Sequence, residues 1–290
     1  MTDITNRTIA INLSKNGNGT GMNHIYTIKF FLFFSFITSA STLVISDVDD
    51  TIRQSNVLNL PRAAIGTLLR KAPEFQTLKN IFNQLNFHYL KSDINFYYLS
   101  ASPKCFLDYD NWVYEKKFPM GSVIQRPCNF KWLIPNYTAK FKFKVIDDII
   151  QEKLKTSSIS QVLLFGDNAE SDAQVYQEIK KKFTNVAIEI FIRDIRVEAT
   201  AVDDALSIKR LEGVNYFLTE FDLIGHSQFY FLTDQQKESI KQDFKTGQLY
   251  PKYLYENLAK RYEKELGIDD DQTLELAYHS LINQLNIEAN

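Results

Sequence analysis

Asp47 and Asp49 follow a short apolar stretch, and their residue type and spacing suit catalysis. The stretch, Leu43–Ser46, is typical of a buried strand in a parallel sheet, and ligands bind at the carboxyl ends of such strands. Because the two aspartates are two positions apart, their side chains can face one ligand, with Asp50 turned away between them. One carboxylate can then attack a substrate while the other transfers protons. Asp-rich loops also form ordinary turns, so the rest of the chain must supply partners.

Two serines follow a second apolar stretch. Asn95–Leu99 predicts another buried strand, and Ser100 and Ser102 come directly after it. A serine at this end of the strand can donate a hydrogen bond to a phosphoryl oxygen at the same edge of the sheet as Asp47. Ser102 precedes Pro103, which also makes it a good N-cap for a helix. The residues alone leave open which serine binds the phosphoryl group and which is structural.

Three lysines, Lys140, Lys142 and Lys144, alternate with phenylalanines ahead of a helix that we expect from about Val145 to Leu154. A lysine can neutralise a nucleophilic carboxylate and an incoming phosphate, two anions that otherwise repel each other. Most lysines are simply solvated. At most one of the three is therefore expected to serve in a site.

A third apolar stretch, Gln161–Phe165, predicts a buried strand that leads into Gly166 and Asp167, with Asp172 five residues later. Carboxylate oxygens suit Mg²⁺, which keeps several waters and takes only one or two protein carboxylates in addition. The spacing of the two aspartates is common on its own. The spacing becomes more informative here because Asp47 and Ser100 also follow predicted buried strands.

The segment Asp47–Ile52 resembles the first motif of the haloacid-dehalogenase superfamily of phosphohydrolases, and the other segments follow in the order of that superfamily. The resemblance implies a Rossmann-like α/β fold, a central parallel sheet flanked by helices. It also implies that Asp47 is a nucleophile that forms an aspartyl-phosphate and that Asp49 is the general acid and base. Members that dehalogenate or pump ions lack the second carboxylate, so its presence points to a phosphatase.

A narrower resemblance covers roughly Leu43 to Gly225. The turn Tyr98–Pro103, an aromatic helix with Trp112 and the segment Phe118–Pro127 are similar to the phosphatidate phosphatase catalytic domain first known from fungal actin patches and widespread in bacteria. This chain departs from that pattern by having Lys104 where an aromatic residue usually follows the proline. The resemblance implies a phospholipid substrate, phosphatidate, which is hydrolysed to diacylglycerol.

The same resemblance selects site residues. It makes Ser100 the second-motif serine and favours Lys142 among the three lysines, with Lys144 as the runner-up. The site residues that we expect are catalytic Asp47, Asp49, Ser100 and Lys142; metal-binding Asp47, Asp49 (through its backbone carbonyl), Asp167 and Asp172; and substrate-binding Thr51, Ser102 and Arg126. The expected cofactor is Mg²⁺.

The amino-terminal residues 1–41 divide into two parts. Residues 1–21 are polar and without periodicity, which is typical of disorder. Residues 22–41 combine a basic flank, the apolar run Phe30–Ile37 and small residues, which is the layout of a secretory signal peptide. This predicts an exported protein, periplasmic or secreted, for which Met22 is the natural start. An uncleaved leader would instead leave a membrane anchor, and a buried apolar element is the remaining alternative.

The remaining chain divides into a phosphatase domain over residues 42–225 and a helical extension over residues 226–290. We expect further helices near residues 62–70, 74–90 and 199–209 and further strands near residues 186–192 and 214–218. The extension should begin with a capping box at Thr233–Gln236. Asp269–Asp271 is expected to cap a helix rather than bind a metal.

Composition excludes few classes of protein. The 290 residues are 44% hydrophobic and 23% charged, as in ordinary globular proteins. The net charge of −2 gives no sign of nucleic-acid binding. Cys105 and Cys128 are expected either to pair in an oxidising compartment or to be two buried free thiols. The sequence does not indicate an oligomeric state.

The function that follows is Mg²⁺-dependent hydrolysis of a phosphomonoester, with phosphatidate as the expected substrate and a membrane surface as the expected partner. One alternative is a phosphatase with the same chemistry that acts on a soluble phosphoester. The other is a catalytically silent protein that binds a metal or a lipid, against which the intact pair Asp47 and Asp49 argues.

Overall fold

The structure is a computed structural model of the chain, and it describes residues 40–55, 74–89, 93–105, 107–128, 136–168, 171–195, 210–217 and 220–245. All of these residues belong to one compact unit of the chain. Residues 1–39 of the predicted leader, the helices near residues 62–70 and 199–209, and the turn Asp269–Asp271 lie outside them, whereas Ser41, the last residue of the predicted leader, begins the first strand. None of the helices in these ranges combines the length and apolar character needed to cross a bilayer.

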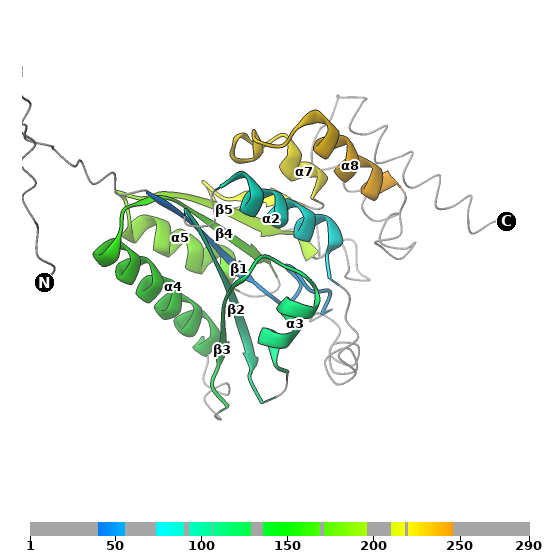
Figure 1. Cartoon of the computed structure of the whole chain (residues 1–290). Coiled ribbons are helices and arrows are strands. Elements are labelled where there is room, and N and C mark those ends of the chain that lie inside the picture. The colour runs from blue at the N-terminus through cyan, green and yellow to red at the C-terminus, as the bar shows by residue number, and fades with distance from the viewer. Residues whose placement is uncertain are drawn as a thin grey trace, which may run out of the picture. The chain divides into compact units, whose positions relative to one another are not determined.

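The described part of the chain is built on one sheet of six parallel strands, which confirms the expected α/β fold (Figure 1). The strands are β1 (Ser41–Asp47), β2 (Ile94–Pro103), β3 (Gly121–Arg126), β4 (Ile159–Asp167), β5 (Ala187–Arg193) and β6 (Asn215–Phe217). Their order in the sheet is β3-β2-β1-β4-β5-β6. The four strands that were predicted after β1 match β2, β4, β5 and β6, whereas β3 was not predicted.

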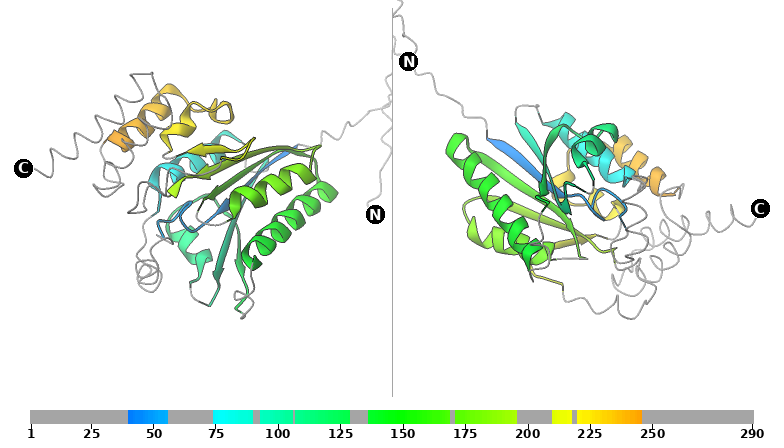
Figure 2. Two further views of the ribbon diagram at one scale, coloured as in Figure 1. Left: turned by 180° about the vertical axis from the view of Figure 1, so that it is seen from behind. Right: turned by 90° about the horizontal axis from the view of Figure 1, so that it is seen from below.

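Helices cover both faces of the sheet. They are α2 (Gln76–His88), α3 (Tyr109–Glu115), α4 (Tyr137–Thr156), α5 (Asp172–Lys182), α7 (Phe221–Ile224), the short 3₁₀ helix η3 (Ser227–Phe229) and α8 (Asp234–Lys245). Figures 1 and 2 show α4 and α5 together on one side of the sheet and α2, α7 and α8 on the other. The alternation of side chains along β1 serves both layers: Val44 packs in the core with α2, and Leu43 and Ile45 pack in the core with α4 and α5.

Helix α4 begins eight residues earlier than predicted, at Tyr137 instead of Val145. The three lysines therefore lie inside the helix and not ahead of it. Lys142 is buried with Ile146, Ile149 and Ile150, so it belongs to the inward-facing stripe of the helix. The alternation of lysine and phenylalanine hid this stripe, because it imitates the period of a strand.

The capping box at the start of α8 is confirmed. The Gln236 N–H donates to Oγ1 of Thr233 at 3.2 Å, and the Thr233 N–H donates to Oε1 of Gln236 at 2.8 Å. The side chain of Gln236 also donates to that of Gln84 on α2. This contact joins α8 to α2 across the domain boundary that was predicted at residue 225.

Candidate functional site

The strand order brings the predicted site residues to one edge of the sheet. β1 lies in the middle, with β2 on one side and β4 on the other, so the ends of β2 and β4 flank Asp47. The strand order also reverses between β1 and β4, and ligands of open α/β sheets bind in the crevice outside the carboxyl ends at that point. Asp47 and Asp167 are the last residues of these two strands.

Asp47, Asp167 and Asp172 form a buried carboxylate cluster. One oxygen from each of the three side chains lies within 4.8 Å of the others. Asp47 and Asp167 are each 3% exposed and Asp172 is fully buried. Asp172 is the first residue of α5, and Gly166 on β4 allows the start of this helix to lie close, since a Cβ atom there would be 2.6 Å from Oδ2 of Asp172.

Lys142 joins two members of this cluster. Its Nζ lies 2.7 Å from Oδ1 of Asp47 and 2.5 Å from Oδ1 of Asp172, and the side chain is 2% exposed. Lys140 and Lys144 are exposed, and Lys144 pairs with Asp148 on the surface of α4. Of the three candidate lysines, Lys142 is the one that the fold brings to Asp47.

Burial raises the pKa of Asp47 well above its usual value. Lys142 acts in the opposite direction, and the neighbouring carboxylates of Asp172 and Asp167 raise the pKa further. The three carboxylates therefore place several negative charges close together in a buried site, with Lys142 against two of them.

A hard divalent cation fits the cluster. The donors are all carboxylate oxygens, which is the ligand set that Mg²⁺ prefers. Oδ2 of Asp172 is buried and accepts no hydrogen bond among the described residues. Asp47, Asp167 and Asp172 are thus the residues that could hold a metal. Asp49 was also predicted to bind the metal, but its carboxylate is not a member of this cluster. Coordination through the backbone carbonyl of Asp49 stays a prediction.

The carboxylate of Asp49 is instead held by five donor side chains. Oδ2 accepts hydrogen bonds from Ser100 at 3.1 Å and from Ser102 at 3.0 Å. Oδ1 accepts one from Nη1 of Arg53 at 2.9 Å and one from Ser55. The hydroxyl of Tyr109 lies within hydrogen-bonding distance of both oxygens, 2.7 Å from Oδ1 and 2.8 Å from Oδ2.

These donors lower the pKa of Asp49. Burial alone would raise it, but the Arg53 guanidinium and the hydroxyls of Ser55, Tyr109 and Ser102 outweigh burial and bring the pKa below its usual value. Burial and the charge of Asp49 raise the pKa of Tyr109, so this phenol stays a proton donor. Asp47 and Asp49 therefore differ in the direction of their pKa shifts although they are two residues apart.

The two predicted serines both reach the site. Ser100 and Ser102 donate to Asp49, and the Ser102 N–H also donates to Oγ of Ser100 at 3.0 Å. Ser102 does not cap a helix, because it lies within β2, which continues to Pro103. The predicted role of Ser100 in orienting a phosphoryl group stays a prediction.

The loop after β1 is fixed by side chains on both sides. Asp50 is buried with a φ of 54°, and its Oδ1 accepts a hydrogen bond from the Ser55 N–H at 2.6 Å. The Thr51 hydroxyl donates to Oδ2 of Asp167 at 3.4 Å. Buried Arg193 donates to the Thr51 carbonyl at 3.3 Å and pairs with buried Glu220. Thr51 thus contacts a residue of the carboxylate cluster, and its predicted contact with substrate stays a prediction.

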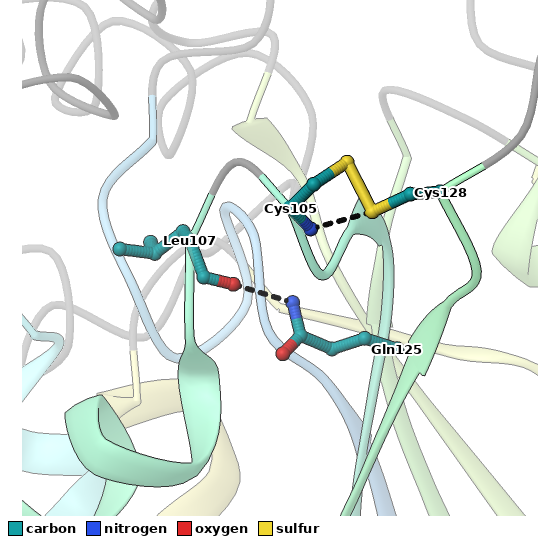
Figure 3. Close-up of a disulfide and its surroundings, with 4 residues drawn as sticks. All are labelled: Cys105, Leu107, Gln125 and Cys128. Carbon is teal, nitrogen blue, oxygen red and sulfur yellow. Dashed lines mark hydrogen bonds between the residues drawn. A yellow bond between two sulfur atoms is a disulfide. The ribbon is translucent and has the colours of Figure 1, made fainter.

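Arg126 ends β3, and its guanidinium lies 5.9 Å from the centre of the Tyr137 ring. Beyond it, Cys128 forms a disulfide with Cys105, and the Cys105 N–H donates to Cys128 Sγ at 2.7 Å (Figure 3). Of the two states expected for these cysteines, the disulfide is the one found. It joins the residues after β2 to the residues after β3, next to the segment that carries Ser102.

Sequence reasoning missed Arg53, Ser55 and Tyr109. All three are buried and contact Asp49. Arg53 and Ser55 come directly after the first motif in the sequence. The signal that could have found them was a charged and a polar residue within a few positions of the end of a predicted buried strand. Tyr109 is sixty positions from Asp49 in the chain, so no local spacing could have connected the two.

Part of this chain is similar in sequence to known proteins. Residues 42–194 match the family model described as "Phosphatidate phosphatase APP1, catalytic domain". The uncharacterized protein C29B5.04c of Schizosaccharomyces pombe is 27% identical over 165 residues, which cover 52% of this chain and 25% of that protein. The chain therefore spans about a quarter of the length of this curated relative. A chain from "Structure of Pnkp1/Rnl/Hen1 complex" aligns with a TM-score of 0.36 and 13% identity, over 52% of this chain and 46% of that one. The family match covers more than half of the sequence, and the chain belongs to the family of the phosphatidate phosphatase APP1 catalytic domain.

Proposed function

We propose that the protein is a Mg²⁺-dependent phosphatase that hydrolyses phosphatidate to diacylglycerol through an aspartyl-phosphate on Asp47. The observation that carries this proposal is the buried cluster of Asp47, Asp167 and Asp172 with Lys142, at the strand ends of a chain from the APP1 catalytic-domain family. A carboxylate beside a buried cation and a hard-cation site is suited to attack on phosphorus.

Mg²⁺ would be held by Asp47, Asp167 and Asp172, with the backbone carbonyl of Asp49 as a further ligand. When bound, it supplies positive charge that stabilises the phosphoryl oxygens as negative charge develops on them. Lys142 supplies a second positive charge from the protein itself, 2.7 Å from Oδ1 of Asp47. Together these charges allow an anionic nucleophile to approach an anionic substrate.

In the first half-reaction an oxygen of Asp47 attacks phosphorus in line with the leaving oxygen. The bond between Asp47 and phosphorus forms as the ester P–O bond breaks. Protonated Asp49 gives its proton to the leaving oxygen, which departs as an alcohol. The 16% exposure of the Asp49 side chain, against 4% for that of Asp47, is consistent with access of Asp49 to the leaving group and to water.

In the second half-reaction Asp49, now ionised, takes a proton from water as the water oxygen attacks phosphorus. The bond to Asp47 breaks, inorganic phosphate leaves, and Asp49 is again protonated. The lowered pKa of Asp49 favours the ionised form that this step needs. The negative charge of a bound phosphomonoester would raise that pKa, which favours the protonated form needed in the first step.

The family description supports phosphatidate as the substrate, and a phospholipid substrate implies work at a membrane surface. The disulfide between Cys105 and Cys128 supports export of the protein to an oxidising compartment, since disulfides persist there. N-terminal sequencing of the native protein tests export. A start at Ser41 or Thr42 is expected after removal of the leader; an intact leader in the membrane fraction supports the anchored alternative.

The activity is tested with the full-length chain. Phosphate release is measured from vesicles of phosphatidate and phosphatidylcholine, with Mg²⁺ or with EDTA, and in parallel from soluble phosphomonoesters. Asp47→Asn removes the nucleophile, and Asp148→Asn is the matched control because Asp148 lies exposed on α4, paired with Lys144. We expect Asp148→Asn to match the unmodified chain, and both EDTA and Asp47→Asn to abolish release.

Other results identify which part of the proposal is wrong. Release from soluble esters alone keeps the mechanism and discards the lipid substrate. Release that survives in Asp47→Asn contradicts the assignment of the nucleophile. Binding of vesicles or metal without turnover of any ester would show a catalytically silent binding protein.

A further inference from the structure

Asp49 has more hydrogen-bond donors around it than Asp47, and two of them come from hydroxyls that no expected role accounts for. Tyr109 lies 2.7 Å and 2.8 Å from the two carboxylate oxygens, and Ser55 donates to Oδ1. Both residues are buried: Tyr109 is fully buried, and Ser55 is 4% exposed. A buried tyrosine ring would pack equally well as phenylalanine, so the position of its hydroxyl needs a separate explanation.

Arg53 orders both hydroxyls toward Asp49. Its Nη1 lies 3.2 Å from the oxygen of Tyr109 and 3.0 Å from the oxygen of Ser55, as well as 2.9 Å from Oδ1 of Asp49, so its two hydrogens are shared among these three acceptors. A hydroxyl that accepts a bond from a guanidinium turns its own proton toward another acceptor. In this site that acceptor is the carboxylate of Asp49.

Tyr109 is itself held in place by its surroundings. It is the first residue of α3, and its N–H donates to Oε1 of Gln125 on β3 at 3.1 Å. The amide nitrogen of Gln125 donates to the carbonyl of Leu107 at 2.8 Å, a contact drawn in Figure 3. The start of α3 is thereby fixed to the sheet, which fixes the backbone from which the phenol of Tyr109 extends.

We propose that the hydroxyls of Tyr109 and Ser55 are positioning groups for Asp49, which fix its carboxylate in the orientation from which it exchanges a proton with the leaving oxygen and with water. Neither hydroxyl gives up its proton in the reaction. The inference deepens the proposed function and rests on it, because it assigns Tyr109 and Ser55 to the proton-transfer half of that mechanism.

The test uses the dependence of the rate on the leaving group. Phosphatidate in detergent micelles releases an alcohol, which needs a proton from Asp49, whereas p-nitrophenyl phosphate releases a stable anion, which does not. The value of kcat/KM reports only the steps up to release of this first product, so the later attack of water does not enter it. For Tyr109→Phe and for Ser55→Ala we expect kcat/KM to fall about 10- to 100-fold on phosphatidate, part of what a general acid contributes, and less than about 3-fold on p-nitrophenyl phosphate.

Tyr98→Phe is the matched control. Tyr98 is also fully buried and donates its hydroxyl to a backbone carbonyl, that of Pro119 at 2.8 Å, away from Asp49. Tyr98→Phe should leave kcat/KM unchanged on both substrates or lower it on both by the same factor. In a chain that already carries Asp49→Asn, adding Tyr109→Phe should produce no further loss on phosphatidate, since the hydroxyl acts through Asp49.

The outcomes separate this inference from the proposed function. Suppose that Asp47→Asn abolishes turnover, but that Tyr109→Phe and Ser55→Ala lower kcat/KM equally on the two substrates or leave both values unchanged. The positioning role is then wrong and the phosphatase mechanism stands. If Asp47→Asn leaves turnover of both substrates intact, the mechanism itself is wrong. Two variants on separate segments keep the test valid when one of them fails to fold.

Discussion

The Nζ of Lys142 lies 2.5 Å from Oδ1 of Asp172, the two side chains being 2% and 0% exposed. Lys142 comes from α4 and Asp172 from the first turn of α5, so the contact links two helices that pack on one face of the sheet. The same lysine reaches Asp47 at the end of β1. One buried cation therefore ties three elements together at the site.

Replacement of Lys142 by methionine should destabilise the protein and stop turnover. The change keeps most of the side-chain volume but leaves the carboxylates of Asp47 and Asp172 buried without their cation, which costs about 3–5 kcal/mol for a broken buried pair. Urea unfolding in EDTA measures the loss, and added Mg²⁺ should recover part of it. Lys144→Met removes only an exposed pair with Asp148 and should change the free energy of unfolding by less than about 1 kcal/mol. Equal losses in the two variants would contradict the role of Lys142.

Gly166→Ala should lower activity through Asp172. A Cβ atom at position 166 would lie 2.6 Å from Oδ2 of Asp172 and 2.8 Å from Cε2 of Tyr176, so the start of α5 must move away from β4. Such overpacking costs about 1–3 kcal/mol, and it displaces a residue that we expect to hold the metal. The measurements are thermal unfolding and phosphate release at several concentrations of Mg²⁺, where we expect a weaker apparent affinity for the metal.

Gly225→Ala is the control for that substitution. Gly225 has a φ of −80°, and no atom lies within 4 Å of the position its Cβ would take. Activity and metal affinity should be unchanged, and stability equal or slightly higher. A similar loss of activity in both glycine variants would rule out the crowding of Asp172 as the cause.

Reduction of the disulfide between Cys105 and Cys128 should lower stability. The two cysteines are 23 positions apart, and closing a loop of that size in the unfolded chain is worth about 3 kcal/mol in the chain-entropy model. Denaturant unfolding with and without dithiothreitol measures this difference. The double variant Cys105→Ser with Cys128→Ser should match the reduced protein and should not respond to dithiothreitol; a response would show that the reductant acts elsewhere.

Stability should also fall in acid through Glu74. Burial would raise the pKa of this carboxyl, but bonds from Lys116 at 2.7 Å and Lys79 at 3.0 Å outweigh it and lower the pKa from 4.5 to about 2. Because the pKa is lower in the folded state, the stabilisation is complete above pH 4.5 and is lost as the pH falls toward 2. The Glu74 side chain is 16% exposed and Lys116 33%, so solvent screening limits the contribution of this carboxylate to about 1 kcal/mol.

The measurement for Glu74 is the free energy of unfolding from pH 7 to pH 2. Glu74→Gln should be less stable than the unmodified chain at neutral pH, and the two curves should converge in the acid range. Asp148→Asn serves again as an exposed control and should run parallel to the unmodified chain. Curves for Glu74→Gln that stay parallel down to pH 2 would contradict the lowered pKa.

The sequence by itself determined where the reactive side chains leave the sheet. Apolar stretches before Asp47, Ser100 and Asp167 are local features, and a polar residue directly after a buried strand must lie at the carboxyl edge of a parallel sheet. The family resemblance added Lys142, which lies in the site. The predictions at the strand ends needed only the local sequence, because each depends on a few neighbouring residues, whereas the choice of Lys142 among the three lysines depended on the family resemblance.

Only the tertiary structure decided which partner each of these residues has. Asp47 receives Lys142, while Asp49, two residues on, receives Arg53, Ser55 and Tyr109. The addition of β3, the early start of α4 and the pairing of Cys105 with Cys128 were decided in the same way. The physical reason is that burial and hydrogen bonding depend on which elements pack together and on how the loops between them fold. Tyr109 is sixty residues from Asp49, and Arg53 and Ser55, although only four and six residues away, reach it because of the path of the loop after β1.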